Sequence, residues 1–309
     1  MAFHLKNNLH RNWTAFDYGF LLFFIAKLPL PLSIFFSSLR GTAYAITQRD
    51  WRKFSFSDVM FNERLNNSYS SLLPNASKWK IKLLTFKRYI EQSHEEVEAA
   101  RLITKDFKNQ KVRYEGLEEL LDFLASNNHG YSKNSPIVFL TAHFGCSIIG
   151  TGLLTPLRKP ILGMSSNVVD NPRVHKRISL FFRKKYAALN RHLLGGEIID
   201  KEGNLRTFSQ FLKQNGIVVI VGDTPPDNKD DLHWHNWNDV FVGLPKGAAK
   251  LAQKNNALFH GFVCTRDKDT LVVTFSAPGE DPYQFIFNQI DKRPALWWAA
   301  DIYDLYPKK

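Results

Sequence analysis

The sequence of 309 residues contains little that would support a disulfide-bonded fold or one embedded in a membrane. It has only two cysteines, Cys146 and Cys264, so we expect no disulfide framework and a reducing, cytoplasmic setting. The most apolar stretch, residues 18–36, is interrupted by Lys27 and Pro29, so no continuous apolar helix of about 20 residues can span a bilayer. The sequence also lacks internal repeats, a Walker loop and a Rossmann glycine fingerprint.

Positive charge and aromatic rings, by contrast, are abundant. The chain has 41 Lys and Arg against 29 Asp and Glu, a formal net charge of +12, together with 25 Phe and 7 Trp. This composition points to a phosphate-rich partner: nucleic acid, an anionic membrane surface or an acidic carrier protein. Because zinc-finger spacing, an aromatic RNA-recognition motif and a basic zipper are all absent, we expect no nucleic-acid partner.

We interpret residues 1–40 as an amino-terminal segment that associates with a membrane. The apolar run starts late and no small-residue cleavage site follows it, so the segment is a poor secretion signal. It is better suited to lie in the membrane interface, with flanking basic residues near the headgroups. These residues are Lys6, His10, Arg11, Arg40, Arg49, Arg52 and Lys53. The alternative is a buried core helix. We expect residues 41–309 to form a single domain.

The rest of the chain predicts an α/β fold. Residues 78–126 read as helices, and Ser93 followed by Glu95 and Glu96 is a capping-box pattern that predicts a helix start. Beyond residue 135, short apolar runs alternate with helical stretches, as in βαβ units. The predicted strands cover 137–140, 160–162, 217–221 and 258–263, with a hairpin partner at 270–275, and the predicted helices cover 172–194, 205–214 and 246–254. We therefore expect a mainly parallel central sheet flanked by helices, with an amino-terminal helical membrane-associating region.

Two of the predicted strands end in an ionisable residue beside a glycine. One leads to His143 and Gly145, and the other leads through Gly222 to Asp223. Ligands of open α/β sheets bind outside the carboxyl ends of the strands, so both residues should face the same region. A histidine there suits a general base, although it could also be satisfied within a tight turn. We interpret the neighbouring Cys146 as a small packing residue rather than as a nucleophile.

Residues 140–145, LTAHFG, resemble the catalytic signature of the lysophospholipid acyltransferase superfamily. The resemblance is to the late acyltransferases of lipid A biosynthesis, whose motif runs His-Phe-Gly-Asn-Trp-Glu. Further segments match the family in the same order, so that the similarity covers most of the chain. They are residues 88–91, 95–101, 204–206, 239–243, 247–252 and 294–298.

The resemblance implies transfer of an acyl group from a thioester, on acyl carrier protein or coenzyme A, to a hydroxyl or amine. The acceptor would be a lipid, a small molecule or a carrier-bound intermediate. The resemblance implies that the reaction takes place at the cytoplasmic face of the inner membrane. His143 would be the general base, and backbone N–H groups near Gly145 would stabilise the oxyanion. Arg191, Arg206 and Phe241 would bind substrate, and no cofactor is expected. The basic helix 172–194 would contact phosphates or form a solvated face.

One position departs from the family pattern. The family places an Asp or Glu five residues after the histidine, where it orients the ring, and this chain has Ile148 there. Three explanations stay open. Another carboxylate orients the ring, with Asp223 the best candidate and Glu197 the second; or the acceptor needs little base assistance; or the protein binds acyl groups or a carrier without transferring them. A carboxylate about 2.6–3.2 Å from a ring nitrogen of His143 would favour an enzyme.

Residues 227–239 invite a metal interpretation, because His233 and His235 lie there among carboxylates. A His-x-His pair can supply two ligands, and Asp residues can complete a divalent site. We nevertheless interpret the segment as a mobile polar lid, with Trp234 and Trp237 giving apolar area to an acyl or carrier contact. The expectation is therefore that no metal is bound.

Overall fold

The computed structural model describes residues 12–55, 60–107, 110–126, 130–165, 168–200, 205–226, 232–237 and 239–309. Within these ranges, seven strands form one sheet in the order β1-β9-β8-β2-β5-β3-β4, and β6 pairs with β7 in a separate hairpin. The strands are β1 Lys111–Glu115, β2 Ile137–Thr141, β3 Ile161–Ser165, β4 Ile198–Asp200, β5 Ile217–Val221, β6 Leu232–Trp237, β7 Val240–Pro245, β8 Leu258–Asp267 and β9 Thr270–Phe275.

The central sheet is mainly parallel, as predicted. Every neighbouring pair runs parallel except β8 and β9, which form the predicted antiparallel hairpin. All five residues of β2 are buried, as expected for an interior strand covered on both faces. The two edge strands, β1 and β4, were not predicted from the sequence. β1 alternates between exposed and partly buried residues, and β4 has only three residues.

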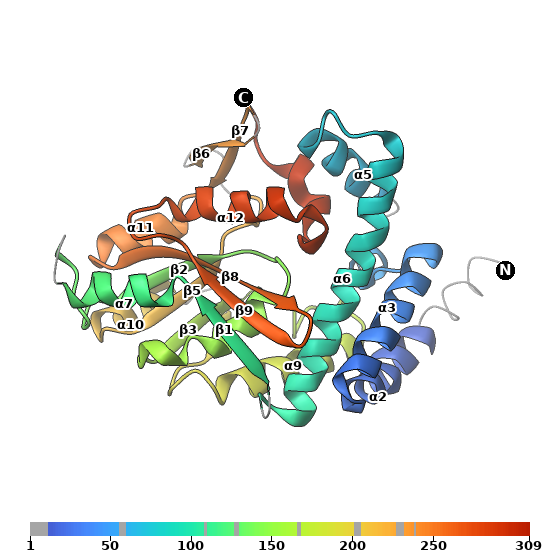
Figure 1. Ribbon diagram of the computed structural model, residues 1–309, viewed down its shortest axis with the longest axis horizontal. Coiled ribbons are helices and arrows are strands. Elements are labelled where there is room, and N and C mark those ends of the chain that lie inside the picture. Colours follow the sequence, from blue (N-terminus) through green and yellow to red (C-terminus); the bar gives the residue numbers. More distant parts are fainter. Residues whose placement is uncertain are drawn as a thin grey trace.

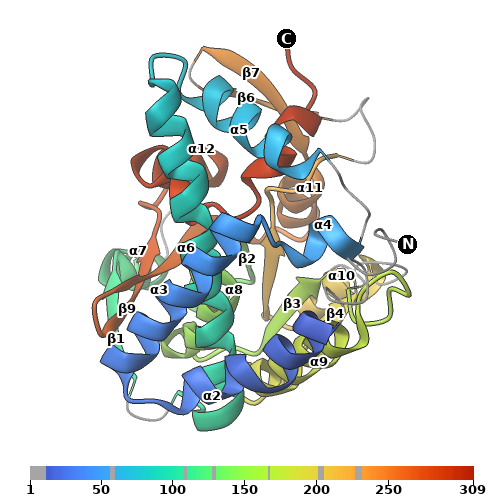
Figure 2. The same ribbon diagram turned by 90° about the vertical axis from the view of Figure 1, so that its right-hand side faces the viewer.

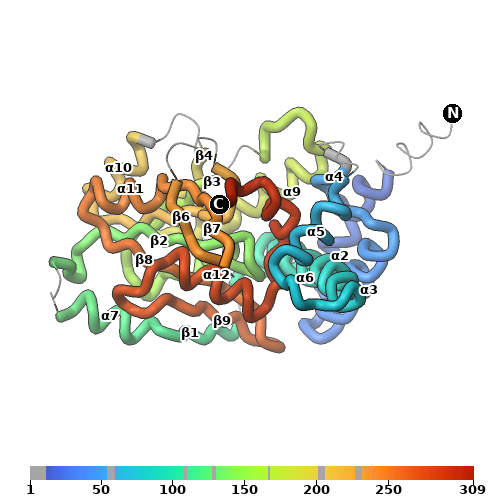
Figure 3. Tube along the Cα trace, turned by 90° about the horizontal axis from the view of Figure 1, so that it is seen from above, coloured from blue at the N-terminus to red at the C-terminus, as the bar shows by residue number. Residues whose placement is uncertain are grey.

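Helices cover both faces of the sheet (Figures 1 and 3). Alternate side chains of β2 point to opposite faces: Val138 and Leu140 pack in a core with α10, α11 and α12, while Ile137 and Phe139 pack with α7 and residues 153–157. The helical elements are η1 Asp17–Leu21, α2 Leu22–Lys27, α3 Leu30–Thr47, α4 Trp51–Ser55, α5 Phe61–Leu72, α6 Lys78–Lys105, α7 Leu117–Ala125, α8 Ser147–Gly150, α9 Lys176–Asn190, α10 Leu205–Lys213, α11 Gly247–Lys254, α12 Pro282–Lys292, η5 Pro294–Leu296 and η6 Ala300–Leu305.

The prediction that a helix starts at Ser93 is wrong, because Ser93 lies in the middle of the 28-residue helix α6. This helix begins after Ser77, whose side chain accepts a hydrogen bond from the Lys80 amide at 3.2 Å. The polar residues that suggested a cap are instead buried partners of other helices. Glu95, for example, forms a 2.5 Å ion pair with Lys185 of α9.

The amino-terminal helices pack against α6, beside the sheet (Figures 1 and 2). Pro29 separates α2 from α3, so the apolar run is divided between two helices. Arg40 is buried and forms ion pairs with Asp17 at 2.6 Å and with Glu96 of α6 at 2.8 Å. The expected boundary at residue 40 therefore falls inside α3. Among the described residues, no helix combines the length and apolar character required to cross a membrane.

The outer face of the same helices is apolar and exposed. The inner face of η1, α2 and α3 is part of the core, as the alternative of a buried helix expected. Large side chains project from the outer face. They are Phe16, Phe20, Phe24, Leu32, Phe35, Phe36, Leu39 and Ile46, all between 40 and 73% exposed. Lys6, His10 and Arg11, which were expected near headgroups, lie outside the described residues.

Candidate active site

The pairing of β2 with β5 places His143 next to Asp223. The two strands are parallel, and Thr141, the last residue of β2, lies opposite Val221, the last residue of β5. The amide of Gly222 donates to the Thr141 carbonyl at 2.8 Å, which extends the pairing by one residue. His143 and Asp223 each follow two residues after the end of their strand, so they come together at the carboxyl edge of the sheet.

Asp223 holds His143 at two points. One carboxylate oxygen, Oδ1, lies 2.8 Å from the ring nitrogen Nδ1, and the other, Oδ2, accepts the backbone N–H of His143 at 2.9 Å. The carboxylate is buried, whereas the side chain of His143 is 24% exposed. Because an ionised carboxylate can only accept, this contact requires the proton on Nδ1, which in the neutral ring leaves the lone pair of Nε2 free. Asp223 therefore lies where a carboxylate could orient the ring in place of the acid missing at Ile148, and that role stays a prediction.

The two tryptophans at residues 297 and 298 complete the surroundings of the pair. The indole N–H of Trp297 donates to Oδ2 of Asp223 at 2.7 Å. Trp298 places its ring edgewise on the imidazole of His143, with ring centroids 4.4 Å apart, and its amide donates to the His143 carbonyl at 3.1 Å. Tyr306 donates its hydroxyl proton to the Asp223 carbonyl at 2.8 Å. The carboxyl-terminal residues therefore fix both members of the pair.

Arg88 is a residue of this region whose role sequence reasoning missed. It is fully buried in α6 and donates to the Trp298 carbonyl at 2.6 and 3.1 Å while pairing with Asp50 at 2.8 Å. Arg52 donates to the same carbonyl at 2.9 Å and pairs with Asp301 at 3.0 Å. No local signal sets Arg88 apart, because α6 contains many other charged residues and the carbonyl that Arg88 binds lies 210 positions away.

Gly145 allows the chain to turn after the histidine. Its φ is +52°, and a Cβ there would lie 2.8 Å from the Cys264 carbonyl oxygen. However, its amide donates to the Leu296 carbonyl at 2.9 Å, and the amide of Cys146 donates to the Cys264 carbonyl at 2.7 Å. The amides of residues 143, 144 and 147 also have protein acceptors. The backbone groups expected to stabilise an oxyanion are thus engaged, and they would need new partners to serve that role.

The side chains that follow the histidine belong to the core. Cys146 is 4% exposed, and burial raises the pKa of its thiol well above the usual value. A thiolate is the nucleophilic form, so its environment opposes a role as nucleophile, and the packing interpretation agrees with the structure. Ile148, at the position of the motif acid, packs against the apolar cluster formed with α2, α6 and α9.

Glu197 and Arg191 lie near the amino ends of the parallel strands, whereas His143 and Asp223 lie at the carboxyl ends. The expectation that Glu197 and Arg191 reach the site is therefore wrong. Arg191 follows the end of α9, and two residues later the Leu193 carbonyl accepts the amide of Ile161, the first residue of β3. Arg191 faces Asp106 at 3.7 Å, while Glu197 directly precedes β4. Since β2, β5 and β3 are in register, the amino ends of these strands are roughly 20 Å from His143 along the strand direction.

Arg206 and Phe241 are also outside the contacts of the pair. Arg206 is exposed in the first turn of α10, and Phe241 of β7 is 44% exposed. In the described part of the chain, no hydrogen bond, ion pair or ring contact joins either residue to His143 or Asp223. Their substrate-binding roles stay predictions.

The segment expected to be a mobile lid, residues 227–239, forms one strand of a β-hairpin in the part that the structure describes. Residues 232–237 form β6, which pairs with β7 from Leu232 opposite Pro245 to Trp237 opposite Val240; residues 227–231 and 238 lie outside the described ranges. Trp237 is 2% exposed, and its ring lies 5.5 Å from that of Trp297. It is a core residue rather than a mobile contact, because cross-strand pairing outweighs the polar composition of the segment.

A cavity of about 240 Å³ lies away from the pair. It is bounded by the end of α6, the start of α3 and the start of β9, with Glu98, Arg101 and Lys105 among its lining residues. Ile149 of α8 reaches its wall, but His143 does not. The candidate site is therefore a partly exposed dyad at the sheet edge, separate from this cavity.

Comparison with known proteins adds no family assignment. No protein-family model matches the chain, and a search of curated proteins finds no significant match. The geometry of the site must therefore support any functional conclusion.

Proposed function

We propose that the protein is an acyltransferase in which His143 is the general base and Asp223 its orienting carboxylate. The acyl donor is a thioester on acyl carrier protein or coenzyme A, and the acceptor is a hydroxyl or amine of a lipid, a small molecule or a carrier-bound intermediate. The observation that carries the proposal is the 2.8 Å distance from Nδ1 of His143 to Oδ1 of Asp223. It lies within the range expected for an oriented base.

The chemistry follows from the free lone pair on Nε2. The acceptor O–H or N–H gives its proton to Nε2 while the oxygen or nitrogen attacks the thioester carbonyl. Asp223 stabilises the imidazolium that forms, as the carboxylate of a Ser-His-Asp triad does. When the tetrahedral intermediate collapses, the C–S bond breaks and the imidazolium returns the proton to the thiolate. The acceptor is then acylated, the thiol is released and His143 is neutral again.

A second candidate is a catalytically silent protein that binds acyl groups or their carrier. The engaged amides of residues 143–147 favour it, because no backbone donor in that turn is open to an oxyanion. The dyad favours the enzyme, since a histidine that served only packing would not require a buried carboxylate as its ring partner. One assay separates the two candidates.

That assay compares the wild type with His143→Ala. Purified protein is incubated with acyl carrier protein thioesters or acyl-coenzyme A and a total lipid extract, and both the free thiol and the acylated products are followed by mass spectrometry. The acyltransferase proposal predicts thiol release matched by a product heavier by one acyl group, both lost in the variant. Binding of the thioester without release in either protein would support the silent candidate instead.

We also propose that the apolar outer face of η1, α2 and α3 rests on the cytoplasmic face of the inner membrane. Cations lie beside two aromatic rings that adjoin this face: Lys184 of α9 is 5.3 Å from the ring centroid of Phe23, and Arg49 is 5.4 Å from that of Trp13. Aromatic side chains with adjacent positive charge suit an interface that contains anionic lipids. Lys185 of the same helix is instead buried against Glu95, so only part of the basic helix can face lipid.

The membrane proposal is best tested by point substitutions, because deleting residues 1–38 would remove the Asp17 partner of the buried Arg40. Phe20 and Phe24 are 58 and 50% exposed. The double change Phe20→Glu and Phe24→Glu should abolish flotation with vesicles that contain anionic lipid, while Trp79→Glu, at a residue 75% exposed on α6, should leave it intact. Equal flotation of all three proteins would contradict the proposal.

A further inference from the structure

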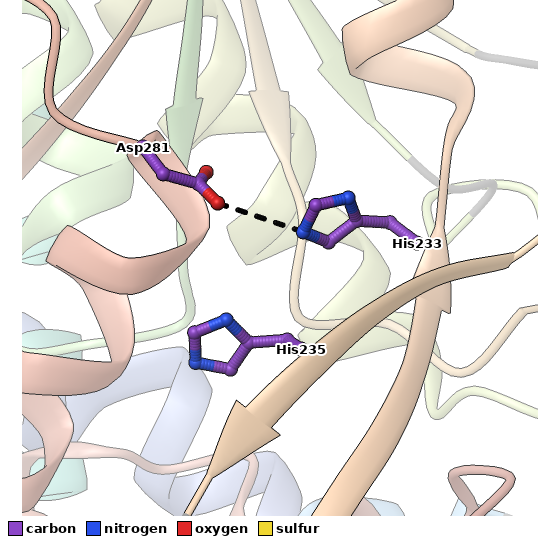
Figure 4. A group of neighbouring side chains, drawn as sticks. All are labelled: His233, His235 and Asp281. Carbon is purple, nitrogen blue, oxygen red and sulfur yellow. Dashed lines mark ion pairs between the residues drawn. The ribbon is translucent and has the colours of Figure 1, made fainter.

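Two histidines of β6 extend toward α12 from the same face of the strand. His233 and His235 are two residues apart, and alternate residues of a strand share a face. Opposite them, Asp281 precedes the first turn of α12 and caps it: its Oδ1 accepts the amide of Tyr283 at 2.9 Å. Figure 4 shows the three side chains converging between the hairpin and the helix. Oδ2 of Asp281 is left to face the histidines.

The distances in this cluster suit a shared metal ion better than direct bonding. Nε2 of His233 lies 3.6 Å from Oδ2 of Asp281, which is too long for a hydrogen bond. Two ligands of a tetrahedral Zn²⁺ at about 2.0–2.1 Å are separated by roughly 3.3 Å. One atom from each of the three residues lies within 4.8 Å of the others, so small side-chain rotations bring the set to that geometry.

A second, independent observation concerns His235. It is 4% exposed, and its Nε2 is buried with no hydrogen-bond partner. Figure 4 shows that the other ring nitrogen, Nδ1, is the one that faces His233 and Asp281. A buried imidazole turned toward two other ligand groups is the arrangement that a metal ion would complete.

Helix α12 holds both imidazoles in place. His233 stacks on Tyr283 with centroids 4.4 Å apart, and His235 stacks on Phe287 with centroids 4.8 Å apart. Tyr283 and Phe287 are one turn apart on the helix, and His233 and His235 are two residues apart on the strand, so each histidine lies beside one aromatic ring. The Tyr283 hydroxyl also donates to the Pro245 carbonyl at 2.7 Å, which fastens the hairpin to the helix. The ligand positions are therefore preorganised, as a metal site requires.

We propose that His233, His235 and Asp281 bind a divalent transition-metal ion, with Zn²⁺ preferred for two imidazoles and one carboxylate. Water completes the coordination, since His233 and Asp281 have side chains 30 and 45% exposed. The ion links the hairpin to α12. It thereby fixes Trp237, two residues beyond His235, against the Trp297 ring that donates to Asp223. This proposal departs from the sequence-based expectation that no metal is bound.

The test uses the full-length protein without an affinity tag, freed of metal with a chelator and titrated with Zn²⁺ by calorimetry. The bound metal is also counted by elemental mass spectrometry. Removing a hydrogen-bond partner of a ligand lowers metal affinity about 10–100-fold, so losing a ligand should cost at least about 100-fold. His233→Gln tests one imidazole. Asp281→Asn tests the carboxylate and keeps the helix cap, because Asn is an equally good capping residue.

The control is His94→Gln, because His94 is a partly exposed histidine of α6 outside the cluster. We expect one Zn²⁺ per chain in the wild type and in His94→Gln, a higher melting temperature with Zn²⁺, and loss of both effects in the two cluster variants. Absence of stoichiometric binding to the wild type would overturn the proposal, as would binding that the cluster variants retain. Neither outcome depends on acyl transfer.

Discussion

Asp223→Asn is the sharpest perturbation of the dyad, because it replaces a single oxygen by an NH₂ group at constant shape. Oδ2 of Asp223 accepts two N–H donors, from the His143 backbone and the Trp297 indole, while Oδ1 faces only Nδ1 of His143. An asparagine therefore keeps its oxygen toward the two N–H groups and turns its NH₂ toward Nδ1. The ring must then accept at Nδ1 and carry its proton on Nε2, so the lone pair that receives the acceptor proton is lost.

The expected magnitude separates catalysis from stability. In the Ser-His-Asp triad the same change costs about 10⁴ in kcat, equivalent to about 5.4 kcal/mol. The fold loses less, about 1–3 kcal/mol, since all three contacts persist but lose their charge assistance. Single-turnover rates of acyl transfer would be measured at a temperature where circular dichroism shows the variant folded, with Asp304→Asn, an exposed carboxylate paired with Lys308, as the control. A variant within about threefold of the wild type would refute the reasoning.

Three further predictions follow from buried groups. Arg88→Met should lower the free energy of unfolding by about 2–3 kcal/mol, measured by urea denaturation, because the buried Asp50 keeps only Arg52 as an ion-pair partner and the Trp298 carbonyl loses the Arg88 donors; an unchanged midpoint would contradict the role assigned to Arg88. Burial lowers the pKa of His260 from 6.5 to about 4, so the unfolded chain takes up a proton in this interval that the folded chain does not, and stability should fall by roughly 3 kcal/mol as pH drops from 6.5 to 4. His260→Phe should flatten that part of the stability curve, and an equal slope in both proteins would contradict it. Cys146→Ala should retain acyl transfer in the same assay, since burial raises the pKa of this thiol, whereas inactivity of a folded variant would restore the nucleophile interpretation.

The parts of the site that depend on local pattern could be predicted from the sequence. The apolar runs before His143 and Asp223 identify interior strands, and the rule that ligands meet at the carboxyl edge brings the two residues together. The sequence did not show that the two strands are neighbours, and the side chains meet only because β2 and β5 pair in register. The resemblance to acyltransferases drew attention to the missing acid at Ile148 and hence to Asp223 as its replacement.

What the sequence could not provide are contacts between distant segments. Arg88 and Trp298 are 210 positions apart, and no periodicity links them. Ser93 looked like a helix cap because a Ser followed by Glu is also the pattern of a helix start. In the structure its hydroxyl instead accepts a hydrogen bond from Arg40 at 3.0 Å. His233 and His235 looked like loop residues because Asp281, their partner, comes from a helix that begins more than forty residues later. Tertiary packing overrode the local signal in each case.

The most direct test of the central claim is the single-turnover rate of acyl transfer from a thioester in the wild type and in His143→Ala. The backbone amide of residue 143 still donates to Asp223 in the variant, so the fold around the site is kept and the loss reports on the imidazole. We predict a rate at least about 100-fold lower in the variant, the range typical of a lost general base. Equal rates in the two folded proteins would contradict the assignment of His143 as the base.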